Sequence, residues 1–118
     1  MNRVEISVLQ PAAALRAVAE TWHRAEAGQD VTPRVTFGSL LELFTAITAA
    51  RMDLMRCIAS HPGLTVAQLA NRLARDARDM QADVTALVDL GLLERDGKGT
   101  LNAPYDEVLI HAAIRDAA

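Results

Sequence analysis

Apolar and polar residues alternate near both ends of the chain, whereas the middle shows the three-to-four-residue spacing of amphipathic helices. Residues 3–9 place valine and isoleucine on one side and polar side chains on the other, which predicts a half-buried strand. Residues 107–114 alternate again and predict a last strand. A shorter alternation within residues 29–38 predicts a loop that contains one short strand.

A helix is expected to begin at Pro11, because proline lacks only an N–H that the first turn of a helix leaves unpaired anyway. It should run to about Ala27, where a glycine follows. Its apolar stripe consists of Leu15, Val18 and Trp22. The later segments can fill a core without this stripe, so we expect it to form much of a two-fold dimer interface together with the first strand. Residues 1–38 are therefore interpreted as a dimerisation segment and residues 39–118 as a second domain.

The next helix is predicted to begin after Ser39, because a serine followed three residues later by Glu42 is the pattern of a capping box. Five large apolar residues supply its expected buried face: Leu40, Leu41, Leu43, Phe44 and Ile47. A second helical stretch covers about residues 50–60, and the pattern fits one kinked helix or two separate ones equally well. The sequence His-Pro-Gly at residues 61–63 then breaks the chain.

Two further helices are predicted on either side of a tight turn. The first is capped by Thr65, with Gln68 three residues later, which repeats the capping-box pattern. The second covers about residues 76–90, begins at Asp76 and ends at Gly91, a residue type that suits the left-handed end of a helix. The buried stripe of this second helix is expected to contain Met80, Val84, Leu87 and Val88.

A β-hairpin is predicted over about residues 93–103. Leu92 and Leu93 should begin its first strand, and the turn Asp-Gly-Lys-Gly at residues 96–99 is a strong hairpin signal. Helix, short helix, tight turn, longer helix and hairpin occur in the order of a winged helix-turn-helix domain. The fold class is therefore predicted to be α+β, mainly α with a small β part: a winged helix-turn-helix with an N-terminal strand–helix extension.

Length and charge limit the classes of protein that fit this pattern. With 118 residues, 51% of them hydrophobic, the chain can form a packed core. A net charge of −3 argues against a protein that coats nucleic acid through bulk charge, although a site-specific DNA-binding protein needs only a local basic surface. The single cysteine excludes an intramolecular disulfide. Without a signal peptide or a long apolar run, the protein is expected in the cytoplasm, with no membrane partner.

The side of the second helix opposite its buried stripe carries the candidate DNA-reading residues. In a helix-turn-helix, this helix enters the major groove of double-stranded DNA, where arginine suits guanine and glutamine suits adenine. The candidate base-reading residues are Arg78, Gln81 and Thr85. The candidate contacts to DNA phosphates are Arg72 and Arg75 near the turn and Arg95 and Lys98 on the hairpin. Asp83 would weaken the positive field of this surface, so we expect it to pair with a nearby arginine.

The region 51–107 resembles the MarR-like predicted transcriptional regulators of bacteria and archaea. The similar features are Arg51 to Leu54, Val66 to Ala70, Arg75-Asp76 before Asp83-Val84, Leu90-Gly91-Leu92, and the run Pro104-Tyr105-Asp106-Glu107. The last run is typical of one small branch of these regulators. The resemblance implies a DNA-binding regulator that is usually a dimer and has no catalytic residues, and for some members it implies a toxin-like partner protein.

The sequence thus predicts a repressor that binds specific DNA sites as a homodimer. The alternative is an antitoxin-like subunit that neutralises a partner protein and regulates its own operon. An enzyme is not expected, because the chain has no nucleophile–base pair, phosphate-binding glycine loop or metal-ligand spacing. Cys57 and His61 are only two possible ligands, so neither a metal nor a cofactor is predicted. Asp106 and Glu107 are adjacent on a strand, point to opposite faces and are expected to be structural.

Overall fold

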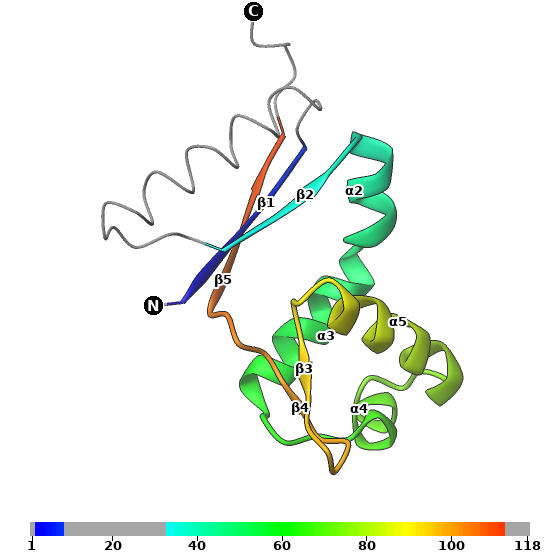
Figure 1. The fold of residues 1–118 in the computed structure, drawn as a ribbon. Helices are drawn as coiled ribbons and strands as arrows, with labels where there is room; N and C mark the ends of the chain where they lie inside the picture. The colour runs from blue at the N-terminus through cyan, green and yellow to red at the C-terminus, as the bar shows by residue number, and fades with distance from the viewer. Residues whose placement is uncertain (1, 9–32, 113–118) are drawn as a thin grey trace, which may run out of the picture. The chain divides into compact units, whose positions relative to one another are not determined.

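The computed structural model describes residues 2–8 and 33–112 (Figure 1). Contacts divide them into two compact units. We call the first the sheet unit and the second the helical unit; the sheet unit contains residues 3–8, 33–45 and 107–112, and the helical unit contains residues 46–106 with Asn2. This division differs from the predicted boundary after residue 38. The predicted N-terminal helix, with Leu15, Val18 and Trp22, lies outside the described residues.

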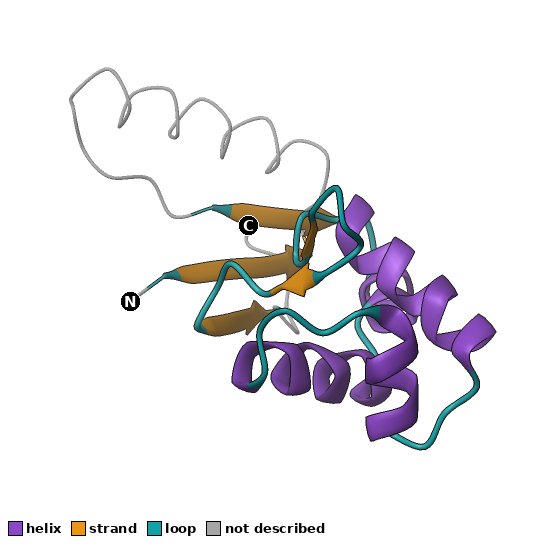
Figure 2. Cartoon of the chain, turned by 90° about the horizontal axis from the view of Figure 1, so that it is seen from below, coloured by secondary structure: helices purple, strands orange, loops and turns teal. Residues whose placement is uncertain are grey.

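The sheet unit is built on three parallel strands: β1 (Arg3–Val8), β2 (Arg34–Phe37) and β5 (Glu107–His111). Their order is β2-β1-β5, so the first strand of the chain lies in the centre (Figure 2). Ile6 of β1 is in register with Val35 on one side and with Ile110 on the other. The alternation predicts all three strands correctly, and the last strand is described as far as His111.

Strand β1 is more buried at its C-terminal end than the alternation predicts, although Arg3 on its polar face is exposed and Glu5 is half-buried. Val4 and Ile6 are buried as expected, but Ser7, expected on the polar face, is buried as well. The central position explains the difference, because β1 has a hydrogen-bonded neighbour along each edge. For the same reason β1 offers no edge for strand pairing with a second chain, and any contribution of residues 1–38 to a dimer must come from elsewhere in that segment.

Helix α2 (Leu40–Ala46) begins where the sequence predicts, with a modified cap. The Ser39 hydroxyl accepts a hydrogen bond from the Glu42 amide at 3.1 Å. In a capping box the Glu42 carboxylate would bond back to the Ser39 amide, but here it accepts from the Gly38 amide at 3.0 Å. The first turn of α2 is therefore joined by hydrogen bonds to both Gly38 and Ser39, the two residues that precede the helix.

The predicted buried face of α2 is wrong in part. Leu43 is fully buried, and Ile47, just beyond the helix, is also buried. The other three predicted residues are exposed: Leu40 by 43%, Leu41 by 78% and Phe44 by 59%. Successive residues of a helix point about 100° apart, so two turns cannot place all five side chains on one buried side.

Helix α3 (Ala49–Ser60) is separate from α2, which decides between the two possibilities that the sequence leaves open. Thr48 caps it, because its hydroxyl accepts a hydrogen bond from the Arg51 amide at 3.2 Å. The helix ends at His61, at the predicted break. Its buried residues are Leu54, Met55 and Ile58.

Helices α4 (Val66–Arg72) and α5 (Ala77–Asp89) follow with the predicted caps. Thr65 and Gln68 exchange both hydrogen bonds of a capping box, and the Asp76 carboxylate accepts from two amides in the first turn of α5. The largest buried side chains of the helical unit come from all three helices and the hairpin: Leu54, Ile58, Leu69, Met80, Val84, Leu87, Leu93 and Leu101. The core is therefore aliphatic, as the composition predicts.

The predicted hairpin consists of β3 (Glu94–Arg95) and β4 (Leu101–Asn102), paired antiparallel. Its first strand begins two residues later than predicted, since Leu92 and Leu93 are buried in the turn before it.

A third chain segment pairs with the outer side of this hairpin. The Gly63 amide donates to the Leu101 carbonyl at 3.1 Å, and the Leu101 amide donates to the Leu64 carbonyl at 2.8 Å. Thr65 also forms an antiparallel bridge with Thr100. The segment before α4 thus ties the hairpin to the helix pair. The resulting order of helix, short extended segment, two helices and hairpin is that of a winged helix-turn-helix, and it confirms the predicted α+β class.

Helices α4 and α5 end in the same hydrogen-bonded loop, the Schellman motif. After α4, the Ala74 amide donates to the Asn71 carbonyl and the Arg75 amide donates to the Ala70 carbonyl. After α5, the Gly91 amide donates to the Val88 carbonyl and the Leu92 amide donates to the Leu87 carbonyl. The motif needs one residue in the left-handed conformation. After α5 this residue is Gly91, with φ of 80°, and after α4 it is Ala74, with φ of 54°. A Cβ makes this conformation costly, so the turn of the helix pair stores strain at Ala74.

We predict opposite effects of exchanging alanine and glycine at these two positions. Ala74→Gly should raise the free energy of unfolding by up to about 1 kcal/mol, because relief of strain outweighs the extra entropy of glycine in the unfolded chain. Gly91→Ala should lower it by about 1 kcal/mol through backbone strain alone, since an added Cβ would meet nothing within 4 Å. Urea unfolding of both variants measures the two signs, and a shared sign would contradict this account.

Candidate nucleic-acid interface

Helix α5 has one buried and one exposed side, as the sequence predicts. Its buried residues are Met80, Val84 and Leu87. The candidate base-reading residues Arg78, Gln81 and Thr85 are all exposed. The Gln81 side-chain amide donates a hydrogen bond to the Thr85 hydroxyl at 3.4 Å, one helical turn further on. These two side chains therefore share one surface of α5, with Arg78 one turn before Gln81.

Asp83 joins three parts of the helical unit. Its carboxylate in α5 accepts a hydrogen bond from Nε of Arg51 in α3 at 3.1 Å, and one from the guanidinium of Arg75, in the turn before α5, at 2.7 Å. Arg51 also donates to the Ala46 carbonyl at 2.8 Å. We call Arg51, Arg75 and Asp83 the arginine–aspartate cluster. The Arg51 and Asp83 side chains are only 20% and 18% exposed, so their charge-assisted hydrogen bond is largely shielded from water.

The cluster confirms the predicted pairing of Asp83 with a nearby arginine and lowers the pKa of this carboxyl. Partial burial alone would raise the pKa of Asp83 above its ordinary 3.8, but the hydrogen bonds and positive charges of Arg75 and Arg51 outweigh burial. One negative charge is thus held between two positive ones, and Asp83 does not make the surface of α5 negative.

Two of the predicted phosphate contacts already have partners within the chain. Arg75 is 31% exposed and holds Asp83, so it has a structural role in the turn between α4 and α5. The guanidinium of Arg72, at the end of α4, bonds to Nε2 of the His61 ring, and both side chains are exposed. Of these two arginines, Arg72 is the one that remains at the surface.

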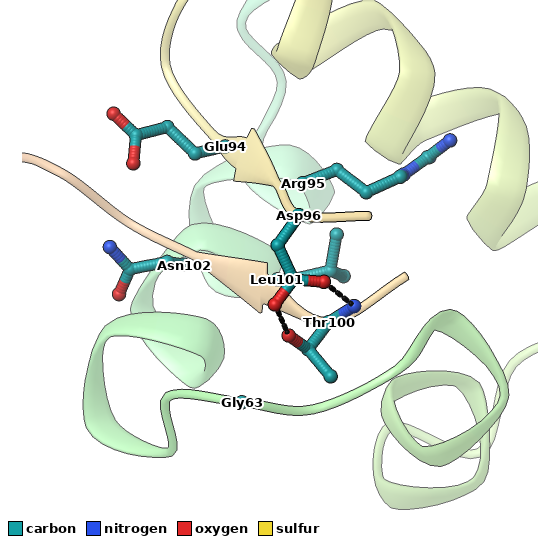
Figure 3. A pocket seen from close by; sticks show the side chains of 7 residues that line it. All are labelled: Gly63, Glu94, Arg95, Asp96, Thr100, Leu101 and Asn102. Atoms are coloured by element: carbon teal, nitrogen blue, oxygen red, sulfur yellow. Dashed lines mark hydrogen bonds between the residues drawn. The ribbon is translucent and has the colours of Figure 1, made fainter. Parts of the chain in front are cut away.

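Asp96 shapes the tip of the hairpin (Figure 3). Its carboxylate accepts hydrogen bonds from the hydroxyl and amide of Thr100 and from the Lys98 amide. These bonds, that of the Thr100 hydroxyl above all, lower the pKa of Asp96. The side chains of Lys98 and Arg95 are exposed, and Figure 3 shows Arg95 pointing to the opposite side of the hairpin from Glu94. The wing therefore presents both predicted cations on a tip with a fixed backbone.

A pocket beside the hairpin is open to solvent. Its lining consists of Gly63, Glu94, Arg95, Asp96, Thr100, Leu101 and Asn102 (Figure 3). Sites for small molecules are usually enclosed and mainly apolar. This hollow is open and only partly apolar, so it does not resemble such a site.

The run Pro104-Tyr105-Asp106-Glu107 contacts the residues at the start of β1. The Asn2 amide donates to the Asp106 carboxylate at 2.9 Å, and the Asp106 amide donates to the Asn2 carbonyl at 2.8 Å. Glu107 forms an ion pair with Arg3 at 3.2 Å. The two neighbouring carboxylates thus bind different partners, which confirms their predicted structural roles.

Metal-ligand groups and membrane-spanning helices are both absent from the described residues. Within residues 2–8 and 33–112, no three histidine, cysteine or acidic side chains gather as metal ligands would. Cys57 is a free thiol, and Nδ1 of His61 lies 3.2 Å from the Cys57 carbonyl. None of the helices described is long and apolar enough to span a bilayer.

Sequence reasoning missed the site roles of Arg51, His61 and Asp96. Arg51 and Asp83 are 32 residues apart, and no local spacing relates them; only the folded chain brings them together. Asp96 carried a usable signal, because an aspartate at the start of a Gly-rich turn commonly accepts hydrogen bonds from the backbone two residues on. His61 gave no signal beyond its place at the end of a helix.

The helix pair, the exposed polar side of its second helix and the attached hairpin define a winged helix-turn-helix protein. The chain belongs to the HVO_A0114 family, whose model matches residues 46–110. That segment contains the whole helix pair, the wing and most of β5. The branch suggested by the Pro-Tyr-Asp-Glu run stays a prediction.

Among curated proteins, none matches this chain. Among solved structures, the chain is similar to the multiple antibiotic-resistance repressor (MarR) from Listeria monocytogenes 4b F2365, with 24% sequence identity and a TM-score of 0.47. The match covers 78% of this chain and 61% of that repressor.

We predict that Asp83→Ala lowers the free energy of unfolding by about 2–3 kcal/mol, because two partly buried guanidinium groups lose their shared acceptor. The contribution of Asp83 also depends on pH. Because folding lowers its pKa, this contribution is present above the ordinary value of 3.8 and is lost as the pH falls through the lower folded value. Urea unfolding at several pH values from about 7 to about 3 should show a steeper loss for the wild type than for Asp83→Asn.

Asp53→Asn is the matched control, because Asp53 is an exposed carboxylate on α3. It should change stability by less than about 0.5 kcal/mol and leave the acid dependence as in the wild type. Identical acid dependence of the wild type and Asp83→Asn would show that the cluster does not stabilise the fold.

Proposed function

We propose that this chain is a sequence-specific regulator of transcription, a repressor, that binds double-stranded DNA as a homodimer in the cytoplasm. The proposal involves no catalytic step, cofactor or metal. The observation that carries it is the exposed polar side of α5, the second helix of a helix-turn-helix, which follows a basic end of α4 and precedes a wing that exposes Arg95 and Lys98. In domains of this kind the second helix lies in the major groove.

Arg78 and Gln81 are the proposed base-reading residues, with Thr85 beside them. An arginine reaches O6 and N7 of guanine with two hydrogen bonds, and a glutamine reaches N6 and N7 of adenine. Both residues lie in the first half of α5, the part of a recognition helix nearest the bases. The Gln81–Thr85 hydrogen bond is long at 3.4 Å, so a base can displace it at little cost.

Arg72, Arg95 and Lys98 are the proposed phosphate contacts, and all three are exposed. Contacts of this type position a protein on DNA without reading its sequence. Arg75 also belongs to the basic end of the turn, but its bond to Asp83 supports a positioning role: it holds the turn that sets the start of α5.

A two-fold dimer would present two α5 helices about 34 Å apart, one turn of DNA. The apolar stripe of Leu15, Val18 and Trp22 is the proposed contribution of residues 1–38 to this dimer.

An antitoxin-like role is the second candidate, and one observation favours it. Leu40, Leu41 and Phe44 are exposed on the short helix α2. Large apolar side chains grouped on a surface are typical of protein-binding sites rather than of DNA-binding ones. The two functions are compatible, because an antitoxin can also repress its own operon. Coexpression with the product of an adjacent reading frame, followed by a growth assay with and without this chain, tests the neutralising role.

We predict that Arg78→Ala weakens binding to the preferred DNA site by about 1–3 kcal/mol and relaxes the preference at one base pair. Selection from randomised duplexes would first identify that site, and titrations on preferred and scrambled duplexes would measure the change. Arg56→Ala removes the same charge from an exposed position on α3 and should leave the sequence preference intact. If Arg78→Ala changed neither affinity nor preference, α5 would not be the reading helix.

Lys98→Ala should act differently, because a phosphate contact carries no sequence information. We predict weaker binding to all duplexes alike and a salt dependence shallower by about one unit in log–log slope. Titrations at several salt concentrations measure this slope. A selective loss on the preferred site alone would place Lys98 at a base and not at a phosphate.

A further inference from the structure

The two edges of the three-stranded sheet are protected to very different degrees. Strand β2 is four residues long, follows Pro33 and exposes Arg34 and Thr36. A proline, charged side chains and short length are the features that keep an edge strand from pairing with other chains. Arg34 also forms an ion pair with Glu5 of the neighbouring strand. The β2 edge is therefore built to stay unpaired.

The β5 edge carries a charged residue only at its start, where Glu107 pairs with Arg3 of β1, and it contains no proline. Its central residues are Val108, Leu109 and Ile110, with no charge and no proline among them. Leu109 is 40% and Ile110 is 48% exposed, although successive residues of a strand point to opposite faces of the sheet. Along the side away from β1, β5 has no partner strand among the described residues. An apolar edge of this kind is a template for a further strand.

The sequence of β5 is complementary to itself when two copies run antiparallel with Leu109 at the centre. In that register Leu109 faces the Leu109 of the other copy, Val108 faces Ile110, and Glu107 faces His111. The apolar centre is then paired with an apolar centre. At each end a carboxylate faces an imidazole that can donate a hydrogen bond. A parallel register would instead place Glu107 opposite Glu107, which is unfavourable.

We infer that two copies of this chain join through β5, edge to edge and antiparallel, with Leu109 at the two-fold axis. The two sheets then form one continuous sheet in which β5 is no longer an edge. A two-fold interface uses the same surface of both subunits, so self-complementarity is the property it needs. The complementary ends favour a second copy over a strand of another protein. The inference does not depend on DNA binding.

The test measures the oligomeric state of the full chain without DNA, by sedimentation equilibrium at micromolar concentration. The wild type is expected to be a dimer. Leu109→Lys places two lysines opposite each other and should raise the dimer dissociation constant at least about tenfold. Ala59→Lys adds the same charge to an exposed position of α3 and should leave that constant unchanged. A monomeric wild type, or a dimer insensitive to Leu109→Lys, would overturn the inference.

Two variants of the same exposed residue test the register. His111→Glu faces Glu107 of the second copy with a like charge and should weaken the dimer, whereas His111→Lys faces it with the opposite charge and should preserve the dimer. The difference should shrink in high salt. Equal dissociation constants for the two variants at low salt would exclude this register.

Cross-linking keeps the test independent of any loss of stability in the lysine variant. In a Cys57→Ser background, Leu109→Cys places one thiol opposite another across the axis, within the Cα separation that a disulfide spans. Mild oxidation should give a covalent dimer in high yield, whereas Ala59→Cys in the same background should not. Cross-linking no better than that of the control would overturn the β5 interface. Failure to bind DNA, in contrast, would bear only on the proposed function.

Discussion

Asp83 fixes the orientation of α5 through directional hydrogen bonds to two other parts of the helical unit. The aliphatic residues of α5 anchor the helix through contacts that are favourable but not directional, so alone they tolerate rotation about the helix axis. The two hydrogen bonds of Asp83 have a definite geometry and end on Arg51 and Arg75, in two other parts of the helical unit. Removing Asp83 leaves two partly buried guanidinium groups without their shared acceptor, which is costly. The buried stripe of Met80, Val84 and Leu87 thus decides which side of α5 faces outward, and the bonds of Asp83 fix the rotation of the helix that orients the candidate base-reading residues.

The turn and the wing are fixed by the backbone and by small polar side chains. The Schellman loop at Ala74 sets the path from α4 to α5, and Asp96 binds three donors at the hairpin tip. The segment 63–65 ties the wing to the start of α4. Each device acts within a few residues, so the positions of Arg72 and Lys98 relative to α5 follow from local hydrogen bonds as much as from the core.

Local signals are what the sequence predicts well here. The caps at Thr65 and Asp76, the left-handed Gly91 and the hairpin turn each depend on a few neighbouring residues, and the structure contains all of them. The exposed side of α5 follows equally well from helical periodicity.

What the sequence does not show depends on contacts between distant residues. The alternating pattern around Ser7 does not reveal that β1 becomes the central strand of the sheet. Likewise, the residues around Leu41 do not reveal which side of α2 is buried. Arg75 has the chemistry of a phosphate ligand, and only the fold shows that Asp83 already uses it. Residue type predicts what a side chain can bind, whereas its partner is decided by packing.

The balance of charge gains meaning once these internal partners are known. Residues 51–100 contain seven basic and seven acidic side chains. Asp76, Asp83 and Asp96 accept hydrogen bonds from their own chain, and Arg51 and Arg75 bind Asp83. Outside the arginine–aspartate cluster, five basic and six acidic side chains remain, because Asp76 and Asp96 are exposed and a hydrogen bond from a neutral group does not cancel the charge of a carboxylate. The region therefore has no excess of positive charge to attract DNA of arbitrary sequence, since such binding grows with the number of neutralised phosphates. In the proposed function, affinity must come from where Arg72, Arg78 and Lys98 lie and from contacts to the bases.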